Sequence, residues 1–445
     1  MKSTLIVFAF IALTFLSWGA YGPVLHIGQE AMTGEDAIDL SRLRPFICVG
    51  LAYFVIAVVA PLLWLKLKGE SGHWTASGTI WSVTAGAVGA IGALGIILAF
   101  AYRGSPLYVM PLVFGGAPVI NTFTTMAMAG TYRQARPIFF VGLALVVAGA
   151  VTVLVTKPHR QGPNATVSET EGAVTVAVKA TRGDGETKQE IATDITKNAD
   201  GSWHVEKVIE SDKTDEKTIY DISRSASGLF AASMTTHGTT TRGGKTTDAK
   251  DIKDVDGPEL RKKKPDLYGE YLTGMKLYRR VAPLDSYEIL LVAFSIGLTV
   301  LCWGAYGPVL HKGQMKMAGS RLRPLLCVGL AYMGIAVIVP MILLGGMETD
   351  SSFTLGGTAW SLAAGAAGAI GALGIIMAFN FGGKPLYVMP LVFGGAPVVN
   401  TSISIVKSAS YDQIGTGFLC GLIIVITGAV TVLVTAPKPQ PKKPS

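Results

Sequence analysis

The side chains in this sequence that could do chemistry are uncharged hydrogen-bonding groups and aromatic rings. Asn121 and Asn400 close two nearly identical stretches, PLYVMPLVFGGAPVINT at 106–122 and PLYVMPLVFGGAPVVNT at 385–401. A buried amide is costly in apolar surroundings unless it is paired or faces water. Each asparagine therefore either binds a solute or makes a hydrogen bond between helices.

A second repeated stretch, WGAYGPVLH, occurs at 18–26 and again at 303–311. Its tryptophans, Trp18 and Trp303, either wall a pocket or belong to the aromatic belt at a membrane surface. Its histidines, His26 and His311, are candidates for a proton relay, because histidine is the side chain that ordinarily exchanges a proton near neutral pH. Their place near the ends of apolar segments argues against that role.

Prolines and glycine pairs interrupt both copies of the asparagine-containing stretch. An internal proline removes a backbone hydrogen bond and bends a helix. In lipid, irregular backbone is tolerated where it is buried in protein or lines a wet cavity. We therefore expect broken helices that line a cavity; kinks that only allow packing are the alternative. The predicted solute site comprises Trp18, Trp303, Asn121, Asn400, Pro111, Pro390, Gly116, Gly395 and the side-specific Asn380.

The elements that must position these residues are membrane-spanning helices. The chain has 445 residues, 50% hydrophobic and only 15% charged. Runs of about 20 apolar residues predict transmembrane helices. They lie near 4–21, 44–65, 79–101, 106–128, 137–156, 287–307, 324–345, 357–379, 385–405 and 415–435. The first resembles a signal peptide, but its repeat deep in the chain predicts that it is a span.

The ten predicted spans form two copies of one unit. Trp18 matches Trp303 at an offset of 285, and from Ser41 onward the offset is 279. The first copy covers 1–157 and the second 284–437, with five spans each. If the connecting linker does not cross the membrane, an odd number of spans inverts the second copy, as in many secondary transporters.

Charge distribution predicts the orientation. With the N-terminus inside, cytoplasmic segments hold thirteen Lys and Arg residues and the short outer loops hold four. Basic residues favour the cytoplasmic side. The sequence therefore predicts a multi-pass protein of the plasma (inner) membrane. Both termini would be cytoplasmic, including the basic tail at 438–445, and the linker would be extracytoplasmic.

The linker at 158–283 is polar and has a different composition. Alternating segments at 173–180, 203–210 and 217–223 are typical of strands. Large apolar residues are sparse, so the linker is either a small β-rich domain or partly disordered. The region 239–266 has the weakest signals for order. No metal-ligand spacing or catalytic constellation is present in it.

Small residues recur every three or four positions at 85–100 and 364–379, and predict faces for close helix packing. No Asp, Glu, Lys or Arg lies centrally in a predicted span. This disfavours a carboxylate proton relay and a strongly charged solute. An uncharged or zwitterionic solute fits better. No nucleophile–base pair or metal set lies in the spans, so we expect neither an enzyme nor a cofactor.

The sequence resembles the drug/metabolite transporter superfamily in three features. These are the two five-span halves, the Trp-Gly-x-x-x-Pro turn of the first and sixth spans, and the repeated PLYVMPLVFGGAPV stretch. The EamA-like members are most similar in layout, and glucose/ribose-porter-type sugar transporters share the Trp-Gly turn. The resemblance covers both membrane copies but not the linker. It implies a ten-helix inverted repeat, a central cavity and alternating access.

The sequence as a whole predicts an all-α polytopic membrane protein with an inserted polar linker. Its expected function is transport of a small polar metabolite. The alternative is a non-transporting anchor or sensor that presents the linker. The expected partners are the lipid bilayer and a small-molecule solute, and a homodimer is possible. The net charge of +8 comes mostly from residues that flank the spans, so it does not indicate binding to nucleic acid.

Overall fold

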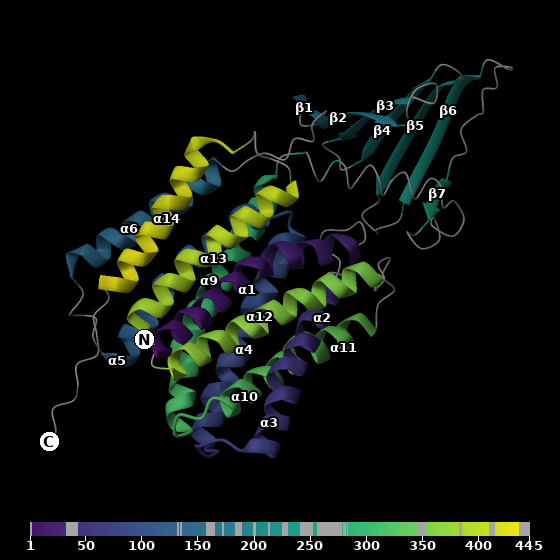
Figure 1. The fold of residues 1–445 in the computed structure, drawn as a ribbon. Coiled ribbons are helices and arrows are strands. Elements are labelled where there is room, and N and C mark those ends of the chain that lie inside the picture. The colour runs from purple at the N-terminus through teal and green to yellow at the C-terminus, as the bar shows by residue number, and fades with distance from the viewer. Residues whose placement is uncertain are drawn as a thin grey trace. The chain divides into compact units, whose positions relative to one another are not determined.

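The computed structural model describes residues 2–32, 43–130, 133, 136–156, 165–170, 173–182, 189–198, 202–211, 214–224, 230–240, 252–255, 278, 282, 284–345, 353–381, 385–408 and 414–435. The chain divides into two compact units. One joins Met1–Pro158 to Asp285–Ser445 and is helical. The other is His159–Leu284 and contains a β-sheet (Figure 1).

The first copy contributes helices and one π-helical turn to the helical unit: α1 (Lys2–Met32), α2 (Leu43–Phe54), a π-turn (Val55–Val59), α3 (Ala60–Lys68), α4 (Ala76–Ala101), α5 (Pro106–Ala129) and α6 (Pro137–Val155). The second copy gives the same series: α9 (Ser286–Lys316), α10 (Leu322–Tyr332), a π-turn (Met333–Ile338), α11 (Val339–Gly345), α12 (Leu355–Asn380), α13 (Pro385–Ser408) and α14 (Thr416–Thr435). The protein is therefore mainly helical, as expected.

Local capping defines where several of these helices begin. Thr75 accepts a hydrogen bond from the Gly78 amide at the start of α4. Asp285 and Glu288 form a reciprocal capping box at the start of α9. Such side chains satisfy amides that have no partner within the first helical turn. Pro106 begins α5, where its missing N–H costs nothing.

Among the described residues, seven helical segments are long and apolar enough to cross a membrane. Shorter apolar helices cover Pro137–Val153, Leu391–Lys407 and Thr416–Val432. The ten apolar runs of the sequence all fall on helices, and the helical unit is membrane-embedded by composition.

The expected breaks in the proline-containing helices are not found. α5 continues as one α-helix through Pro111 and Pro118, and α13 is likewise assigned as one α-helix. The irregular winding lies instead in the two π-turns, where the Ala60 amide donates to the Val55 carbonyl and the Val339 amide to the Gly334 carbonyl. Pro61 and Pro340 follow these turns, and a wider turn relieves the clash of a proline ring with the carbonyl four residues before it.

Helices of one copy pack on helices of the other. The Thr14 hydroxyl donates to the Gly371 carbonyl (3.2 Å), which joins α1 to α12. The matching Thr299 hydroxyl donates to the Gly92 carbonyl (3.1 Å), which joins α9 to α4. Glycines make this close approach possible: a Cβ added at Gly28 of α1 would lie 2.9 Å from the backbone nitrogen of Ser361 in α12. The two small-residue faces are therefore close-packing faces, as predicted.

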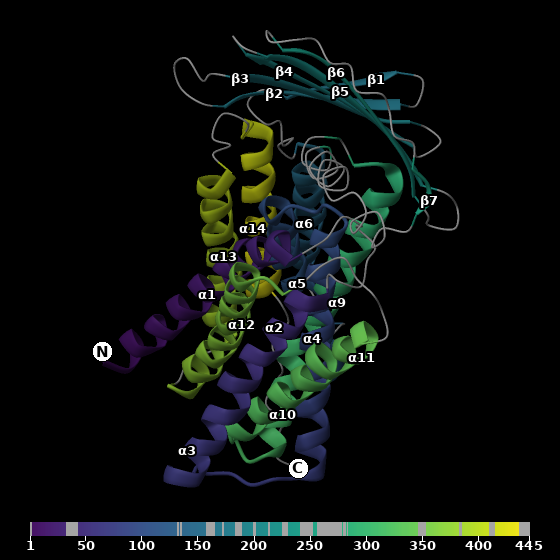
Figure 2. The same cartoon turned by 90° about the vertical axis from the view of Figure 1, so that its right-hand side faces the viewer.

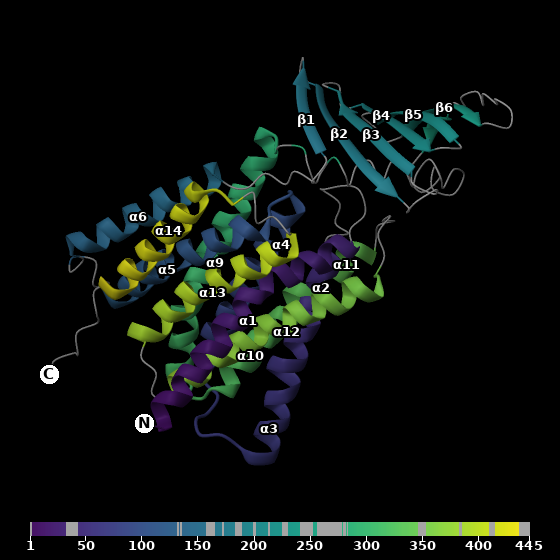
Figure 3. The same cartoon turned by 45° about the horizontal axis from the view of Figure 1, so that its top comes forward.

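Direction follows from these contacts. Residue numbers rise along α1 as they fall along α12, since Thr14 meets Gly371 and Gly28 meets Gly357. The pair α9 and α4 is antiparallel in the same way. Figures 1 and 3 show α1 beside α12 and α6 beside α14.

The second unit contains an antiparallel sheet with the order β1-β2-β3-β4-β5-β6-β7 among the described strands (Figure 2). The strands are β1 (Ala165–Thr170), β2 (Ala173–Arg182), β3 (Gln189–Lys197), β4 (Trp203–Ser211), β5 (Thr214–Arg224), β6 (Phe230–Thr240) and β7 (Ile252–Val255). Val176 pairs with Ile195 and Ile195 with Val205, and all three are buried.

The three strand predictions for the linker are confirmed by β2, β4 and β5. Of the region 239–266, the end of β6 and the whole of β7 are strand. The rest of that region lies outside the described residues.

Candidate functional site

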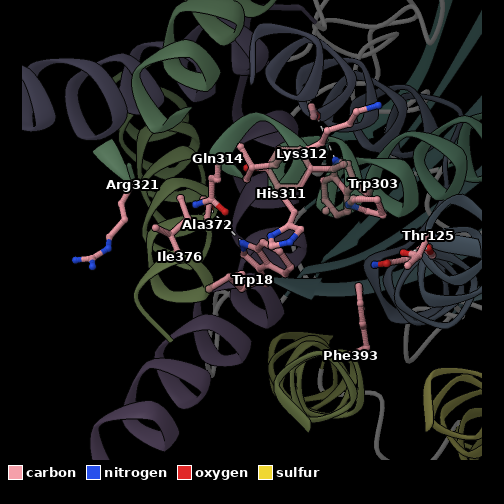
Figure 4. A pocket seen from close by; sticks show the side chains of 18 of the residues that line it. Trp18, Thr125, Trp303, His311, Lys312, Gln314, Arg321, Ala372, Ile376 and Phe393 are labelled. Carbon is pink, nitrogen blue, oxygen red and sulfur yellow. Dashed lines mark hydrogen bonds between the residues drawn. The ribbon is translucent and has the colours of Figure 1, made fainter. Parts of the chain in front are cut away.

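The helical unit contains a cavity of about 900 Å³ between the two copies (Figure 4). Its walls come from α1, α2, α4, α5, α9, α10, α12 and α13. The lining residues used below are Trp18, Tyr21, Tyr53, Asn121, Thr125, Met128, Trp303, Tyr306, Gly307, His311, Lys312, Gln314, Met315, Arg321, Tyr332 and Ile376.

Two tryptophans are held at the inner part of the cavity by equivalent hydrogen bonds. The Trp18 indole donates to the Gly368 carbonyl and the Trp303 indole to the Gly89 carbonyl, both at 3.2 Å. Each bond crosses from one copy to the other. The rings are only partly buried, so the structure places both tryptophans in a pocket wall, where a ring face can stack on a solute.

Tyrosines form the central part of the wall. The rings of Tyr53 and Tyr332 stack with centroids 3.8 Å apart and planes 4° apart. Tyr21 meets Trp303 edge to face at 5.9 Å. Tyr21 is 3% exposed, and its hydroxyl has no hydrogen-bond partner among the described residues. A buried hydroxyl without a partner costs free energy, so this oxygen would gain from a polar partner if the wall opened to it.

The two asparagines have different environments although their sequence contexts match. Asn121 lies on the cavity wall with Thr125, one helical turn further along α5. Asn400 is fully buried, and its amide donates to the Pro106 carbonyl at 2.8 Å. Of the two readings of this motif, Asn121 takes a position that suits solute binding, and Asn400 makes the bond between helices.

Three other predicted site residues, Pro111, Gly116 and Gly395, are not among the residues that line this cavity. Pro111 is buried within α5. A Cβ on Gly116 would meet the Val300 side chain at 2.9 Å, and one on Gly395 would meet the Phe15 ring at 2.8 Å. These glycines therefore allow α5 to pack on α9 and α13 on α1. Their predicted role at a solute site therefore stays a prediction, and in this structure both glycines serve close packing.

Pro390 and Asn380 belong to α13 and α12 respectively. Their side chains lie outside the described part of the structure, so their predicted solute contact stays a prediction.

Polar side chains gather where the cavity reaches the C-terminal end of α9. His311, Lys312, Gln314 and Arg321 line it there (Figure 4). The Lys312 ammonium lies 3.8 Å from the centroid of the Trp81 ring, a favourable cation–π distance. Among the described residues that line the cavity, none is acidic. The nearby Glu70 carboxylate accepts hydrogen bonds from Ser320 and from the Arg321 amide.

The opposite end of the helical unit is tightly packed. His26, Gln29 and Asn400 are buried there, whereas their counterparts at the end of α9 are more exposed: His311 is exposed, and Gln314 and Asn121 are half-buried. Gln29 is buried and donates to the Ile97 carbonyl at 3.1 Å. The cavity is therefore accessible from the end of α9 and sealed at the equivalent end of α1.

The sequence analysis did not identify Thr125, Gln314 or the stacked tyrosines. A signal for the tyrosines was present, since each ends a copy of the repeated motif CVGLAY. No group of three or more His, Cys, Asp or Glu residues that could hold a metal ion occurs in the described ranges. Aromatic and other apolar side chains make up most of the wall, with Asn121, Thr125 and Gln314 among its uncharged polar groups. Such a wall suits a solute that has an apolar or ring face and a few polar groups.

Comparison with known proteins returns no match to a family model, to a curated protein or to a solved structure. The assignment of function therefore depends on the cavity itself.

Proposed function

We propose that this protein is a membrane transporter of a small polar solute. The observation that carries the proposal is the aromatic and polar cavity between the two copies, sealed at one end and accessible at the other. Solute sites of many secondary transporters lie between repeated halves, and access alternates between the two sides. Here the ten apolar runs would all span the bilayer, as two inverted five-helix repeats.

The inverted arrangement is supported by helix directions. α1 runs parallel to α13, because Phe15 meets Gly395 and Gly19 meets Val399. α9 runs parallel to α5 in the same way, because Val300 meets Gly116 and Gly304 meets Ile120.

The two parallel pairs run in opposite directions. The C-terminal half of α13 meets the first residue of α5, since Asn400 bonds to the Pro106 carbonyl. The equivalent helices α1 and α9 would therefore cross the membrane in opposite directions. With the N-terminus inside, the cavity would open to the cytoplasm.

The lining predicts the class of solute. Trp and Tyr rings suit a flat or ring-shaped face. Asn121, Thr125 and Gln314 offer both donors and acceptors. Lys312 and Arg321 sit at the rim and would accept one carboxylate. We therefore favour an uncharged or zwitterionic metabolite with a ring, moved without a resident cofactor or catalytic step.

A matched pair of variants tests the proposal. Thr125 bonds the Asn121 carbonyl and Thr152 bonds the Ala148 carbonyl, each four residues back along its helix at 2.8 Å. Only Thr125 lines the cavity. Small polar metabolites would be measured inside and outside cells that lack the protein or carry the wild type, Thr125→Val or Thr152→Val.

A solute that redistributes with wild type and Thr152→Val, and less with Thr125→Val, supports the proposal. Equal redistribution of the solute with both variants would show that Thr125, and with it this part of the cavity wall, does not contact the transported solute. No redistribution by correctly inserted wild-type protein would favour the alternative, an anchor or sensor for the β unit. Deletion of 165–275 then decides, because a transporter keeps its activity without the sheet and a sensor does not.

A further inference from the structure

Three contacts of the sealed end join residues that are identical in the two copies. The Gln29 amide donates to the Ile97 carbonyl (3.1 Å). The Asn400 amide donates to the Pro106 carbonyl (2.8 Å). The third contact is between the rings of His26 and Phe100, whose centroids are 5.2 Å apart. Together these contacts bring α1 onto α4 and α13 onto α5 at this end.

Every residue in these contacts has an identical residue at the equivalent position of the other copy. Gln29 and Ile97 correspond to Gln314 and Ile376, Asn400 and Pro106 to Asn121 and Pro385, and His26 and Phe100 to His311 and Phe379. Four of these counterparts line the open cavity: Asn121, and Gln314, Ile376 and His311, which are labelled in Figure 4. The open end therefore carries the same set of closing groups, and among the described residues no hydrogen bond joins Gln314 to Ile376 as Gln29 is joined to Ile97.

We infer that these groups close the cavity in a second conformation. Gln314 then donates to the Ile376 carbonyl, Asn121 donates to the Pro385 carbonyl and His311 packs on Phe379, while the three contacts of the sealed end separate. The purpose of this exchange rests on the proposed transport function, although its geometry does not. Asn121, His311 and Gln314 thus have two roles: they face the solute in one conformation and seal it in the other.

Two equivalent glycines lie beside the two asparagines. A Cβ added at Gly22 would collide with Met110 and lie 3.2 Å from the Asn400 side chain, so the sealed end is tightly packed at this glycine. Among the described side chains, a Cβ added at the equivalent Gly307 would meet the Asn121 amide at 3.5 Å, which is an ordinary van der Waals contact.

The middle of the bundle does not need to change during the exchange. The two Trp–Gly hydrogen bonds have the same length in both copies. The stack of Tyr53 on Tyr332 joins the same position of each copy. A contact that is the same in both copies can be kept when the two copies exchange conformations. These central contacts can therefore act as the pivot. The hydrogen bonds lost at one end equal those gained at the other, which keeps the two conformations close in free energy.

One contact of the sealed end has no identical counterpart. The Lys407 ammonium lies 3.1 Å from the Glu30 carboxylate. The equivalent residues are Met128 and Met315, both exposed on the cavity wall. The ion pair can therefore stabilise only the conformation described here, and it biases the equilibrium toward opening at the α9 end.

These four positions give a matched cross-linking experiment. The four native cysteines are replaced by alanine, and cysteines are introduced in pairs: Glu30→Cys with Lys407→Cys, and Met128→Cys with Met315→Cys. A short bifunctional thiosulfonate is applied to membranes. We expect the first pair to cross-link quickly and the second more slowly, as the second conformation is visited. In a protein that carries all four introduced cysteines, cross-linking of the first pair should prevent cross-linking of the second pair.

Two results would overturn the inference. The first is that the pair Met128→Cys and Met315→Cys never cross-links. Two controls must hold for this result to count: a thiol reagent labels Met128→Cys alone, and the first pair cross-links, which shows that the protein is folded. The other is a second pair that reacts equally after the first is locked. The transport proposal can fail independently of this inference. If each cross-link excludes the other but no solute moves, the exchange of contacts stands and transport is rejected. If a solute is transported but the second pair never cross-links, transport stands and the exchange is rejected.

Discussion

Tyr53 and Tyr332 stack face to face at the centre of the helical unit, with ring centroids 3.8 Å apart. They are the same position of the two copies, 279 residues apart. A residue that meets its own counterpart lies on the local two-fold axis that relates the copies there. The stack therefore marks the point about which the two halves are arranged, and both rings also line the cavity.

Truncation of this stack tests its importance. Tyr332→Phe keeps the ring and removes only the hydroxyl, so we expect transport within about twofold of wild type. Tyr332→Ala removes the ring; an aromatic pair contributes about 0.5–1.5 kcal/mol beyond the area that it buries. We expect a lower melting temperature in detergent and a large loss of transport. Equal behaviour of the two variants would show that the stack is not the pivot.

The two asparagines should respond differently to the same substitution. Asn400→Leu removes a buried hydrogen bond between helices, which contributes about 0.5–1.5 kcal/mol, so we expect reduced thermal stability. Asn121→Leu leaves the stability of the described conformation nearly unchanged and weakens solute binding. Melting temperature and the concentration dependence of uptake distinguish the two effects. Identical losses of stability would contradict the different environments of the two residues.

Glycines beside the tryptophans should not tolerate a methyl group. A Cβ at Gly92 or Gly371 would collide with the ring of Trp303 or Trp18, so Gly92→Ala or Gly371→Ala must displace an indole from the cavity wall. The control is Gly297→Ala in α9, where a Cβ meets no atom within 4 Å.

Alanine is favoured over glycine in a helix interior by about 0.5–1 kcal/mol. We therefore expect the control to be neutral or slightly stabilised in a melting experiment. Comparable destabilisation of all three variants would show that the loss of glycine flexibility, and not the collision with tryptophan, is responsible.

The ion pair between Glu30 and Lys407 should set the balance between conformations. Changing both to Met makes this end match the other. Exposed ion pairs contribute about 0.2–1 kcal/mol, so the population of the second conformation should rise by up to about fivefold. The measurement is the rate at which the pair Met128→Cys and Met315→Cys cross-links, which should rise by the same factor. An unchanged rate would show that the pair contributes no bias.

The sequence by itself determined the helical membrane unit, its two copies and the sheet-forming linker. Runs of apolar residues, repeats and alternation are local signals, and the energy that places them in lipid or in a strand depends on composition over a short window. The small-residue faces at 85–100 and 364–379 were predictable for the same reason, because close packing requires small side chains wherever the partner lies.

Only the tertiary structure decided which repeated residues face the cavity. Asn121 and Asn400 have the same neighbours in sequence, yet one lines the cavity and the other bonds to Pro106. The helices beside them are closer at one end of the bundle than at the other, and a repeat cannot encode that difference. The internal prolines were misread similarly: α5 accommodates Pro111 without a break, while the wider turns lie before Pro61 and Pro340. Whether a proline breaks a helix depends on the partners that its neighbours supply, and these come from distant segments of the chain.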